Sequence, residues 1–203
     1  MSELIPPPEP ASTGAEKPKY KVTGIARNLE RGLVIVNTGD GKGKSSAAFG
    51  VVARAVGQGL KCLIVQFVKG NWRTGEQKAM QLLGVEMYQM GYGFIRIRPS
   101  HKTEDEHFAK MLATFEFAQE KAASDAYDLI VLDEACFAMS IGGLDPVLVV
   151  RWLQEDKPKR LHVILTGRGA PEAIINAADL VTEMRLLKHY YDRGIGAVRG
   201  LEF

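Results

Sequence analysis

A glycine-rich run with two lysines and two serines stands early in the chain. It reads VNTGDGKGKSSAAFG over residues 36–50. Backbone amides of such a run can turn toward an anion, while a lysine followed by a serine supplies a cation and a metal-binding hydroxyl. The run therefore predicts a phosphate-binding loop that contains Gly39, Asp40, Gly41, Lys42, Gly43, Lys44, Ser45 and Ser46.

The loop departs from the usual G-x-x-x-x-G-K-[ST] pattern at one position. The first glycine of that pattern would fall at residue 38, where this chain has Thr38. A simple glycine-rich turn with exposed lysines is the alternative reading. The flanks favour phosphate binding, because an apolar strand pattern (32–37) precedes the loop and a helical pattern (43–59) follows it, as the motif requires.

Two acids end the apolar run YDLIVLDEA at residues 127–135. Carboxylate oxygens beside bound phosphates are typical ligands of Mg²⁺. Asp133 and Glu134 are therefore predicted to hold Mg²⁺, or Mn²⁺, together with Ser45. A pair of solvated acids at the end of a strand is the alternative.

Two arginines and one dense segment complete the candidates. Arg168 lies in TGRG, after another strand pattern, where its guanidinium could bind a phosphate through two hydrogen bonds. Arg54, two turns into the helix after the loop, is either a nucleotide-binding residue or a plain surface residue. The segment KHYYDRG (188–194) fits a binding site and a solvated tail equally well.

The elements that must position these residues alternate along the chain. Strands are predicted at 32–37, 61–67, 84–90, 127–135, 161–167 and 179–187, and helices at 43–59, 103–123, 145–155 and 171–178. Strands that are apolar on both faces and alternate with helices indicate an α/β fold, with a mostly parallel sheet covered on both faces. Ligands of such sheets bind at the carboxyl ends of the strands. The loops after Asn37, Phe67, Met90, Leu132 and Leu165 are therefore expected on one rim.

Composition limits the remaining possibilities. The 203 residues carry a net charge of +2 and 46% hydrophobic residues, so nothing points to a nucleic-acid or membrane partner. Residues 1–25 are rich in Pro, Glu, Ser, Thr and Lys and predict a flexible arm, leaving residues 26–203 as a single domain. Cys62 and Cys136 lie in apolar runs and predict buried free thiols, as in the cytoplasm.

From the residues alone, the site is a magnesium-dependent nucleoside triphosphate site whose reaction stays open. Glu134 could act as a base toward water, giving a conventional P-loop ATPase. The same residue could act toward an acceptor hydroxyl, giving a small-molecule kinase. A nucleotide-dependent binding switch without chemistry is the third alternative.

Six stretches together resemble one known family. They read TGDGKGKSSAAFG…RAVGQG, VQFVKGNWRTGE, GYGF, VLDE, ILTGRG and KHYYDRGIGAVRGLEF, in this order between Arg31 and Phe203. Their order and spacing are similar to those of the ATP:corrinoid adenosyltransferases of the CobA/CobO type. The loop of that family also lacks the standard first glycine and reads TG(D/N)GKGK(S/T), so Thr38 fits its pattern.

The resemblance implies a RecA-like P-loop fold, a homodimer and a defined reaction in vitamin B12 biosynthesis. The 5′-deoxyadenosyl group of ATP passes to the cobalt(I) of a corrinoid, and triphosphate is released. The acceptor would be cob(I)yrinic acid a,c-diamide, cobinamide or cobalamin, and an electron donor such as a flavoprotein would reduce the cobalt. ATP is implied to bind in the reverse sense to most P-loop enzymes. Cobalt(I) carries no proton, so no general base is needed, and Lys42, Lys44 and the metal would neutralise the leaving triphosphate.

One departure from the family concerns the corrin. Family members carry a Phe and, two residues later, a Trp that press on the lower face of the corrin. Phe94 matches and is implied to be catalytic, as is Lys44 on the phosphates, but Arg96 stands at the Trp position. Either Tyr92 or another residue displaces the lower cobalt ligand, or the acceptor has no base to displace, which favours cobyrinic acid diamide. Arg96 and Arg98 could instead bind carboxylates of the acceptor.

Overall fold

The computed structural model describes residues 30–70, 74–93, 95 and 102–202. Six parallel strands form one sheet in the order β3-β2-β4-β5-β1-β6. They are β1 (Val34–Thr38), β2 (Cys62–Gln66), β3 (Glu86–Gln89), β4 (Leu129–Asp133), β5 (His162–Thr166) and β6 (Leu180–Glu183). The predicted parallel α/β fold is confirmed, whereas the predicted arm, Phe94, Arg96 and Arg98 lie outside the described residues.

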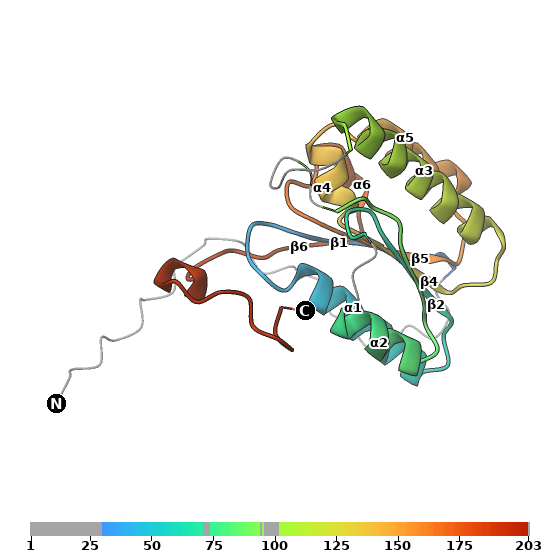
Figure 1. The fold of residues 1–203 in the computed structure, drawn as a ribbon. Helices are drawn as coiled ribbons and strands as arrows, with labels where there is room; N and C mark the ends of the chain where they lie inside the picture. The colour runs from blue at the N-terminus through green and yellow to red at the C-terminus, as the bar shows by residue number, and fades with distance from the viewer. Residues whose placement is uncertain (1–29, 71–73, 94, 96–101, 203) are drawn as a thin grey trace, which may run out of the picture.

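Helices cover both faces of this sheet (Figure 1). One face carries α1 (Lys44–Gly57) and α2 (Gly75–Leu82). The other carries α3 (Glu104–Ala123), α4 (Ala135–Ser140), α5 (Pro146–Arg151) and α6 (Glu172–Ala177). No helix in the described part of the chain is long and apolar enough to cross a membrane.

The buried strand β4 shows how the sequence builds two cores. Side chains alternate between the two faces of a strand. Ile130 and Leu132 pack into the cluster under α3–α6, while Leu129 and Val131 pack into the cluster under α1 and α2. Because both faces are covered, the strand reads as a continuous apolar run, as parallel strands commonly do.

Local signals set the starts of the longer helices. Thr103 caps α3, since its hydroxyl accepts a hydrogen bond from the amide of Glu106, whose side chain accepts from the amide of Thr103 in return. Asp145 caps α5 by accepting from the amide of Val147, and Pro146 occupies the first helical position. The α5 helix then continues as a π-helix over Trp152–Asp156.

Two helices were not predicted from the sequence. Helix α2 buries only Met80, so its apolar pattern is weak, although Thr74 caps it by accepting from the amide of Gln77. Helix α4 has six residues and follows β4 directly, and its first residue was counted within the predicted strand 127–135. The last strand is also shorter than the predicted 179–187, because β6 ends at Glu183.

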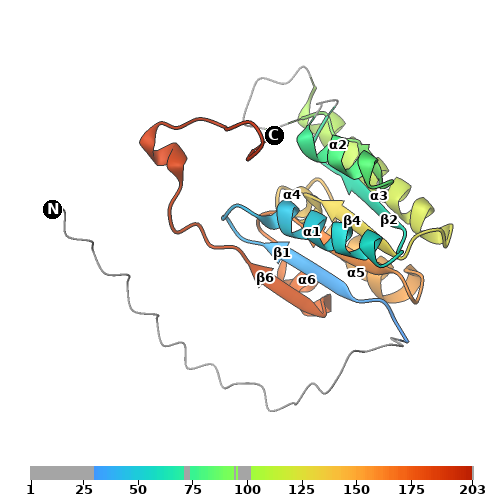
Figure 2. The ribbon, with the colours of Figure 1, turned by 90° about the horizontal axis from the view of Figure 1, so that it is seen from below.

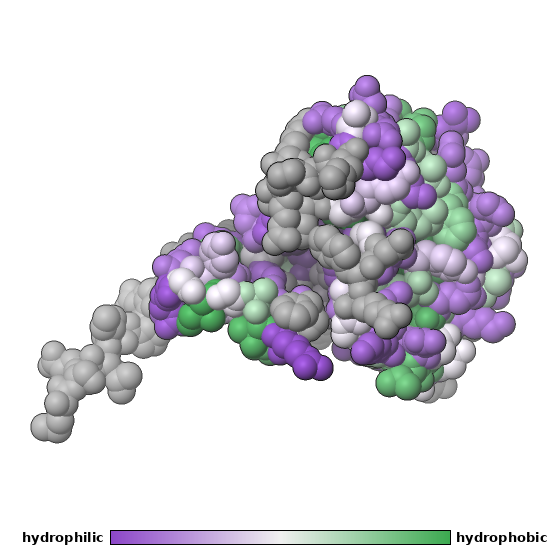
Figure 3. Space-filling view, in the orientation of Figure 1, coloured by the Kyte–Doolittle hydropathy of each residue, from purple (hydrophilic) through white to green (hydrophobic). Residues whose placement is uncertain are grey.

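The chain after β6 leaves the sheet and later returns to a cavity beside the start of α1. Figure 2 shows this segment, in red, curving away from β6 through a 3₁₀ turn at Tyr190–Arg193. Its last described residues line this cavity. This segment exposes several large apolar or aromatic side chains, namely Leu186, Leu187, Tyr191, Ile195 and Leu201. Figure 3 shows green, hydrophobic atoms among purple ones on the projecting part of the molecule.

Candidate active site

The predicted phosphate loop connects β1 with α1, as its sequence pattern requires. Gly39 has a φ of 93° and Gly43 a φ of 108°, both in the region that favours glycine. Thr38, in contrast, is the last residue of β1, and its hydroxyl accepts a hydrogen bond of 3.1 Å from the amide of Ala170. The position of the missing first glycine therefore belongs to the strand, and the turn begins one residue later.

A second glycine of the loop is required by packing. The amide of Gly41 donates to the carbonyl of Met184 at 2.7 Å, and a Cβ added at Gly41 would lie 2.7 Å from the same oxygen. The amide of Met184 in turn donates to the carbonyl of Thr38 at 2.8 Å. The backbone of Met184, directly after β6, thus packs against the phosphate loop and is hydrogen-bonded to it.

Lys44 lies inside the loop. Its side chain is buried, and its Nζ donates to the carbonyls of Gly39 at 2.7 Å and Gly41 at 2.6 Å. Burial lowers the pKa of Lys44, the charge of Arg168 lowers it further, and Glu134 opposes both effects. The loop therefore holds a cation whose neighbours are an arginine and a carboxylate.

A cavity of about 520 Å³ opens beside this loop. Eight of the predicted site residues line it: Gly41, Lys42, Gly43, Lys44, Ser45, Ser46, Glu134 and Arg168. Gly39 and Asp40 belong to the same loop but do not line the cavity. Arg54 lies exposed in the last turn of α1, away from the cavity lining, so its role in nucleotide binding stays a prediction.

The two adjacent acids at the end of β4 have different surroundings. Asp133 is 1% exposed and is absent from the cavity lining, whereas Glu134 lines the cavity. Glu134, which directly precedes α4, has a φ of 64°, a backbone conformation that non-glycine residues adopt at a cost. Burial raises the pKa of Glu134, and the charge of Asp133 raises it further, while Lys44 and other cations lower it.

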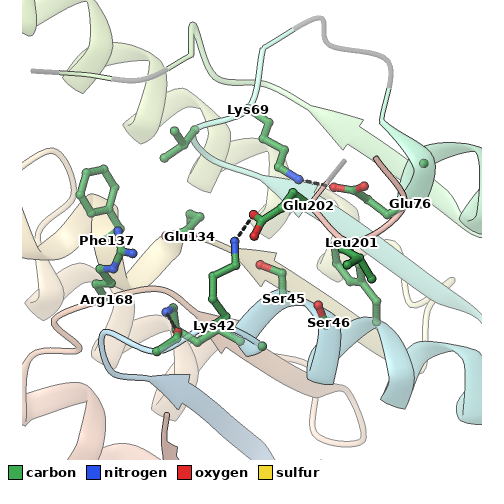
Figure 4. Close-up of a pocket in the computed structure, with 17 residues that line it drawn as sticks. Lys42, Ser45, Ser46, Lys69, Glu76, Glu134, Phe137, Arg168, Leu201 and Glu202 are labelled. Atoms are coloured by element: carbon green, nitrogen blue, oxygen red, sulfur yellow. Dashed lines mark hydrogen bonds and ion pairs between the residues drawn. The ribbon is translucent and has the colours of Figure 1, made fainter. Parts of the chain in front are cut away.

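Three charged residues of the cavity were missed by the sequence reasoning. Lys69, after β2, pairs with Glu76 in the first turn of α2, and Lys42 pairs with Glu202 near the end of the chain. Figure 4 shows the Lys42–Glu202 pair above Ser45 and Ser46, with the Lys69–Glu76 pair beyond Glu202. Lys69 and Glu76 lie within the motif VQFVKGNWRTGE, which follows a strand that ends at the ligand-binding rim. That position could have identified both residues as candidates for the site. Glu202 gave no comparable signal.

A second group of side chains lies on the same rim, beyond β3. The amide of Gly91 donates a hydrogen bond of 3.0 Å to the carbonyl of Lys69, and this bond joins the two parts of the rim. Tyr92 is exposed, with the Nζ atoms of Lys102 and Lys110 at 5.3 and 6.0 Å from its ring centroid and the ring of His107 at 5.8 Å. An exposed aromatic ring with two lysine ammoniums nearby, that of Lys102 being paired with Glu106, therefore lies beside the phosphate loop cavity.

The arrangement of the cavity suits a polyphosphate. Lys42, Lys44, Lys69 and Arg168 all line it, together with loop amides and the amino terminus of α1. Among the described residues, no three acids, histidines or cysteines cluster as a self-contained metal site. A divalent ion here would depend on Ser45, Glu134 and bound phosphates, which is how Mg²⁺ is commonly held.

Comparison with known proteins gives consistent results. The family model described as ATP:corrinoid adenosyltransferase BtuR/CobO/CobP matches residues 30–203. A corrinoid adenosyltransferase of a Sinorhizobium species is 44% identical over 86% of this chain and 81% of its own length. One of Pseudomonas aeruginosa is 43% identical over 86% and 85%, and the corrinoid adenosyltransferase CobA of Salmonella typhimurium is 37% identical over 86% and 87%. The chain therefore belongs to the ATP:corrinoid adenosyltransferase family, and it is an enzyme whose substrates are ATP and a corrinoid.

Proposed function

We propose that this enzyme transfers the 5′-deoxyadenosyl group of ATP to the cobalt(I) of cob(I)yrinic acid a,c-diamide and releases triphosphate. Cobinamide and cobalamin are the alternative acceptors. The observation that carries the proposal is the convergence of Lys42, Lys44, Lys69 and Arg168 on one cavity, in a chain of this family. This cluster suits a leaving group with several negative charges.

For this reaction the protein must position the two substrates and stabilise negative charge on the leaving group. The electron pair of cobalt(I) forms a bond to C5′ of ATP, and the bond from C5′ to the α-phosphate oxygen breaks, so that triphosphate leaves with the electron pair of the broken bond. No proton moves, and hence no general base is required. Holding the two reactants in line is worth several kcal/mol. The cations of the cavity and the loop amides stabilise the charge that develops on triphosphate.

We place the triphosphate along the loop from Gly39 to Ser46, with its adenosyl end toward Tyr92. This reverse orientation of ATP brings C5′ toward the acceptor instead of exposing the γ-phosphorus. It rests on the family resemblance and on the position of Tyr92 on the same rim.

We assign Mg²⁺, or Mn²⁺, to the hydroxyl of Ser45 and the carboxylate of Glu134, while Asp133, the preceding residue, is held by Gln66 and Thr166. Both Ser45 and Glu134 line the cavity, and their oxygens are the ligand type that Mg²⁺ takes beside phosphates. When bound, the ion would add positive charge next to the leaving triphosphate.

The preferred acceptor follows from the cationic surroundings of Tyr92. Lys110 lies over its ring, so an acceptor with free carboxylates would find complementary charge there, whereas the ammonium of Lys102, also over the ring, pairs with Glu106. The sequence adds Arg96 at the position of the family tryptophan, in the part that the structure does not describe. Both features favour cobyrinic acid diamide over an acceptor that carries a nucleotide base.

A single assay separates the proposed reaction from its rivals. The protein is incubated with ATP, Mg²⁺, a reductant and a corrinoid, and the phosphate product is identified. Triphosphate with a light-sensitive cobalt–carbon product is the expected result. ADP with phosphate would instead support an ATPase, ADP with a phosphorylated acceptor a kinase, and intact ATP a binding switch.

The proposal extends to partners. A homodimer is inferred from the resemblance, and it would cover exposed apolar side chains such as Leu180 and Val181 on the edge strand β6. An electron donor such as a flavoprotein would supply cobalt(I). The cytoplasmic location stays a prediction.

A further inference from the structure

Asp133 and Glu134 are neighbours in sequence but are held by different parts of the protein. Asp133 points into the sheet, where Gln66 Nε2 donates to its Oδ2 at 2.7 Å and Thr166 Oγ1 donates to its Oδ1 at 2.8 Å. Gln66 and Thr166 are both fully buried, on the two strands that flank β4. Each oxygen of Asp133 therefore has a fixed donor from a neighbouring strand.

Thr166 makes a second contact that reaches Glu134. Its Oγ1 accepts a hydrogen bond of 3.0 Å from the backbone amide of Glu134. That amide belongs to the residue with a φ of 64°, at the point where the chain turns from β4 into α4. This turn sets the direction in which the side chain of Glu134 leaves the backbone. The hydroxyl of Thr166 therefore holds the backbone of Glu134, which lines the cavity, whereas Asp133 does not.

The orientation of Gln66 is set by Asp133. The amide nitrogen of Gln66 faces Asp133, and its Oε1 is buried without a hydrogen-bond partner among the described residues. A buried acceptor without a partner costs stability and is uncommon in native proteins. The donor group of Gln66 is thus directed to the second oxygen of Asp133, and no other described side chain competes for it.

We propose that Thr166 is a positioning residue for Glu134: its hydroxyl bridges the Asp133 carboxylate and the Glu134 amide, and it thereby fixes the Glu134 carboxylate toward a divalent ion at the triphosphate. Gln66 holds the other oxygen of Asp133 and so fixes the orientation of the bridge. Asp133 acts through Thr166 and does not itself contact the ion. The inference rests on the proposed metal site, but it does not require the transfer reaction.

The test uses the full chain and Mn²⁺ as the probe, with ATP present and no corrinoid. Mn²⁺ binding is measured by electron paramagnetic resonance for the wild type, Thr166→Val and Thr166→Ser. Valine keeps the shape but removes the hydroxyl, so the Mn²⁺ dissociation constant should rise about tenfold or more, as is typical when an outer-shell partner of a metal site is lost. Serine restores the hydroxyl and should return binding to within about twofold of the wild type.

Thr114→Val is the matched control. Thr114 is also fully buried, and its hydroxyl donates to the carbonyl of Lys110 at 2.7 Å within α3, away from the cavity. The proposal would be overturned if Thr166→Val weakened Mn²⁺ binding no more than Thr114→Val does. If Thr166→Val does not fold, Gln66→Met carries the test, and unchanged Mn²⁺ binding in that variant would reject the network.

The outcome is independent of the transferase assignment. A wild-type protein that makes no adenosylated corrinoid but binds Mn²⁺ with ATP, and loses that binding on Thr166→Val, would support the positioning role while rejecting the proposed reaction. If the wild type forms the product and Thr166→Val leaves Mn²⁺ binding unchanged, the proposed reaction is supported and the positioning role of Thr166 is rejected.

Discussion

The rim at the carboxyl ends of the strands has two sides with different construction. The nucleotide side consists of the loop 39–46 and the ends of β4 and β5, where buried strands and backbone hydrogen bonds fix nearly every group. The proposed acceptor side consists of residues 91–93 with Lys102, His107 and Lys110, where the exposed ring of Tyr92 has two lysine ammoniums within 6.0 Å, one of them paired with Glu106. Binding a triphosphate calls for a preformed cradle, whereas a large corrinoid can be bound by a broad surface. We therefore expect changes on the nucleotide side to affect turnover and changes on the acceptor side to affect acceptor choice.

The largest expected effect is on the nucleotide side. Lys44→Met removes a charge that faces the triphosphate, and we expect turnover to fall by roughly 100-fold or more, with a much smaller change in the corrinoid KM. Steady-state kinetics with each substrate varied measure both quantities. Lys78→Met, at an exposed lysine of α2, is the control and should leave turnover unchanged. Near-normal turnover in Lys44→Met would reject the assignment of the loop.

Phe94→Ala addresses the acceptor side. The residue is implied to press on the corrin and remove the lower cobalt ligand, which makes cobalt(I) accessible. We expect the rate from cobalt(II) to fall roughly tenfold, or about 1.4 kcal/mol in barrier, with little loss when cobalt(I) is supplied. Equal losses in the two assays would contradict a ligand-displacing role. The same pair of assays on Tyr92→Ala shows whether the exposed ring takes over this role.

Lys110→Gln tests whether charge on the acceptor side selects the acceptor. Lys110 is half-buried, and a contact of its charge with a carboxylate at the surface is worth up to about 1 kcal/mol, so we expect the KM to rise about two- to fivefold for a corrinoid with free carboxylates. The KM for a fully amidated corrinoid should stay constant. Lys121 lies over the ring of Tyr88 at 5.1 Å on the same helix, and Lys121→Gln therefore controls for loss of a lysine–aromatic contact. An equal KM change for both corrinoids would remove the selective role of Lys110.

Glu202→Gln tests the ion pair of Lys42 and Glu202 on the nucleotide side. Glu202 pairs with Lys42 and also accepts from the hydroxyl of Tyr190, so its carboxylate competes with phosphate for a loop cation. Removing this charge should lower the ATP KM about twofold at low salt, with a smaller effect at high salt because exposed pairs are screened. Glu120→Gln, at an exposed acid of α3, is the control. An unchanged ATP KM at low salt would show that the pair does not oppose nucleotide binding.

The smallest expected effect concerns the thiols of the two cores. Burial raises the pKa of Cys62 to about 11 and that of Cys136 to about 12. At pH 8 the folded protein should therefore hold almost no thiolate, and iodoacetamide should leave turnover unchanged. After denaturation both thiols should react, as mass spectrometry would report. Rapid loss of activity at pH 8 would mean that one thiol is accessible near the site.

The nucleotide side was largely predictable because its chemistry is local in sequence. Glycines, Lys44 and Ser45 follow one another, and the strand and helix patterns around them specify how they are presented. The different orientations of Asp133 and Glu134 were not predictable, since they depend on donors from two other strands and on a left-handed backbone. Glu202 was missed because its approach to Lys42 depends on the path of the last twenty or so residues. Helix α2 was missed because it buries a single side chain.

The position of β1 in the sheet has a consequence for synthesis of the chain. The first strand to be made has β5 and β6, the last two strands, as its neighbours. The phosphate loop that follows it depends on the backbone at Met184 for a hydrogen bond and for close packing. A nascent chain on the ribosome therefore carries the complete loop sequence long before the loop can take its final form. We expect nucleotide binding to be acquired only after residue 184 has left the exit tunnel, late in translation.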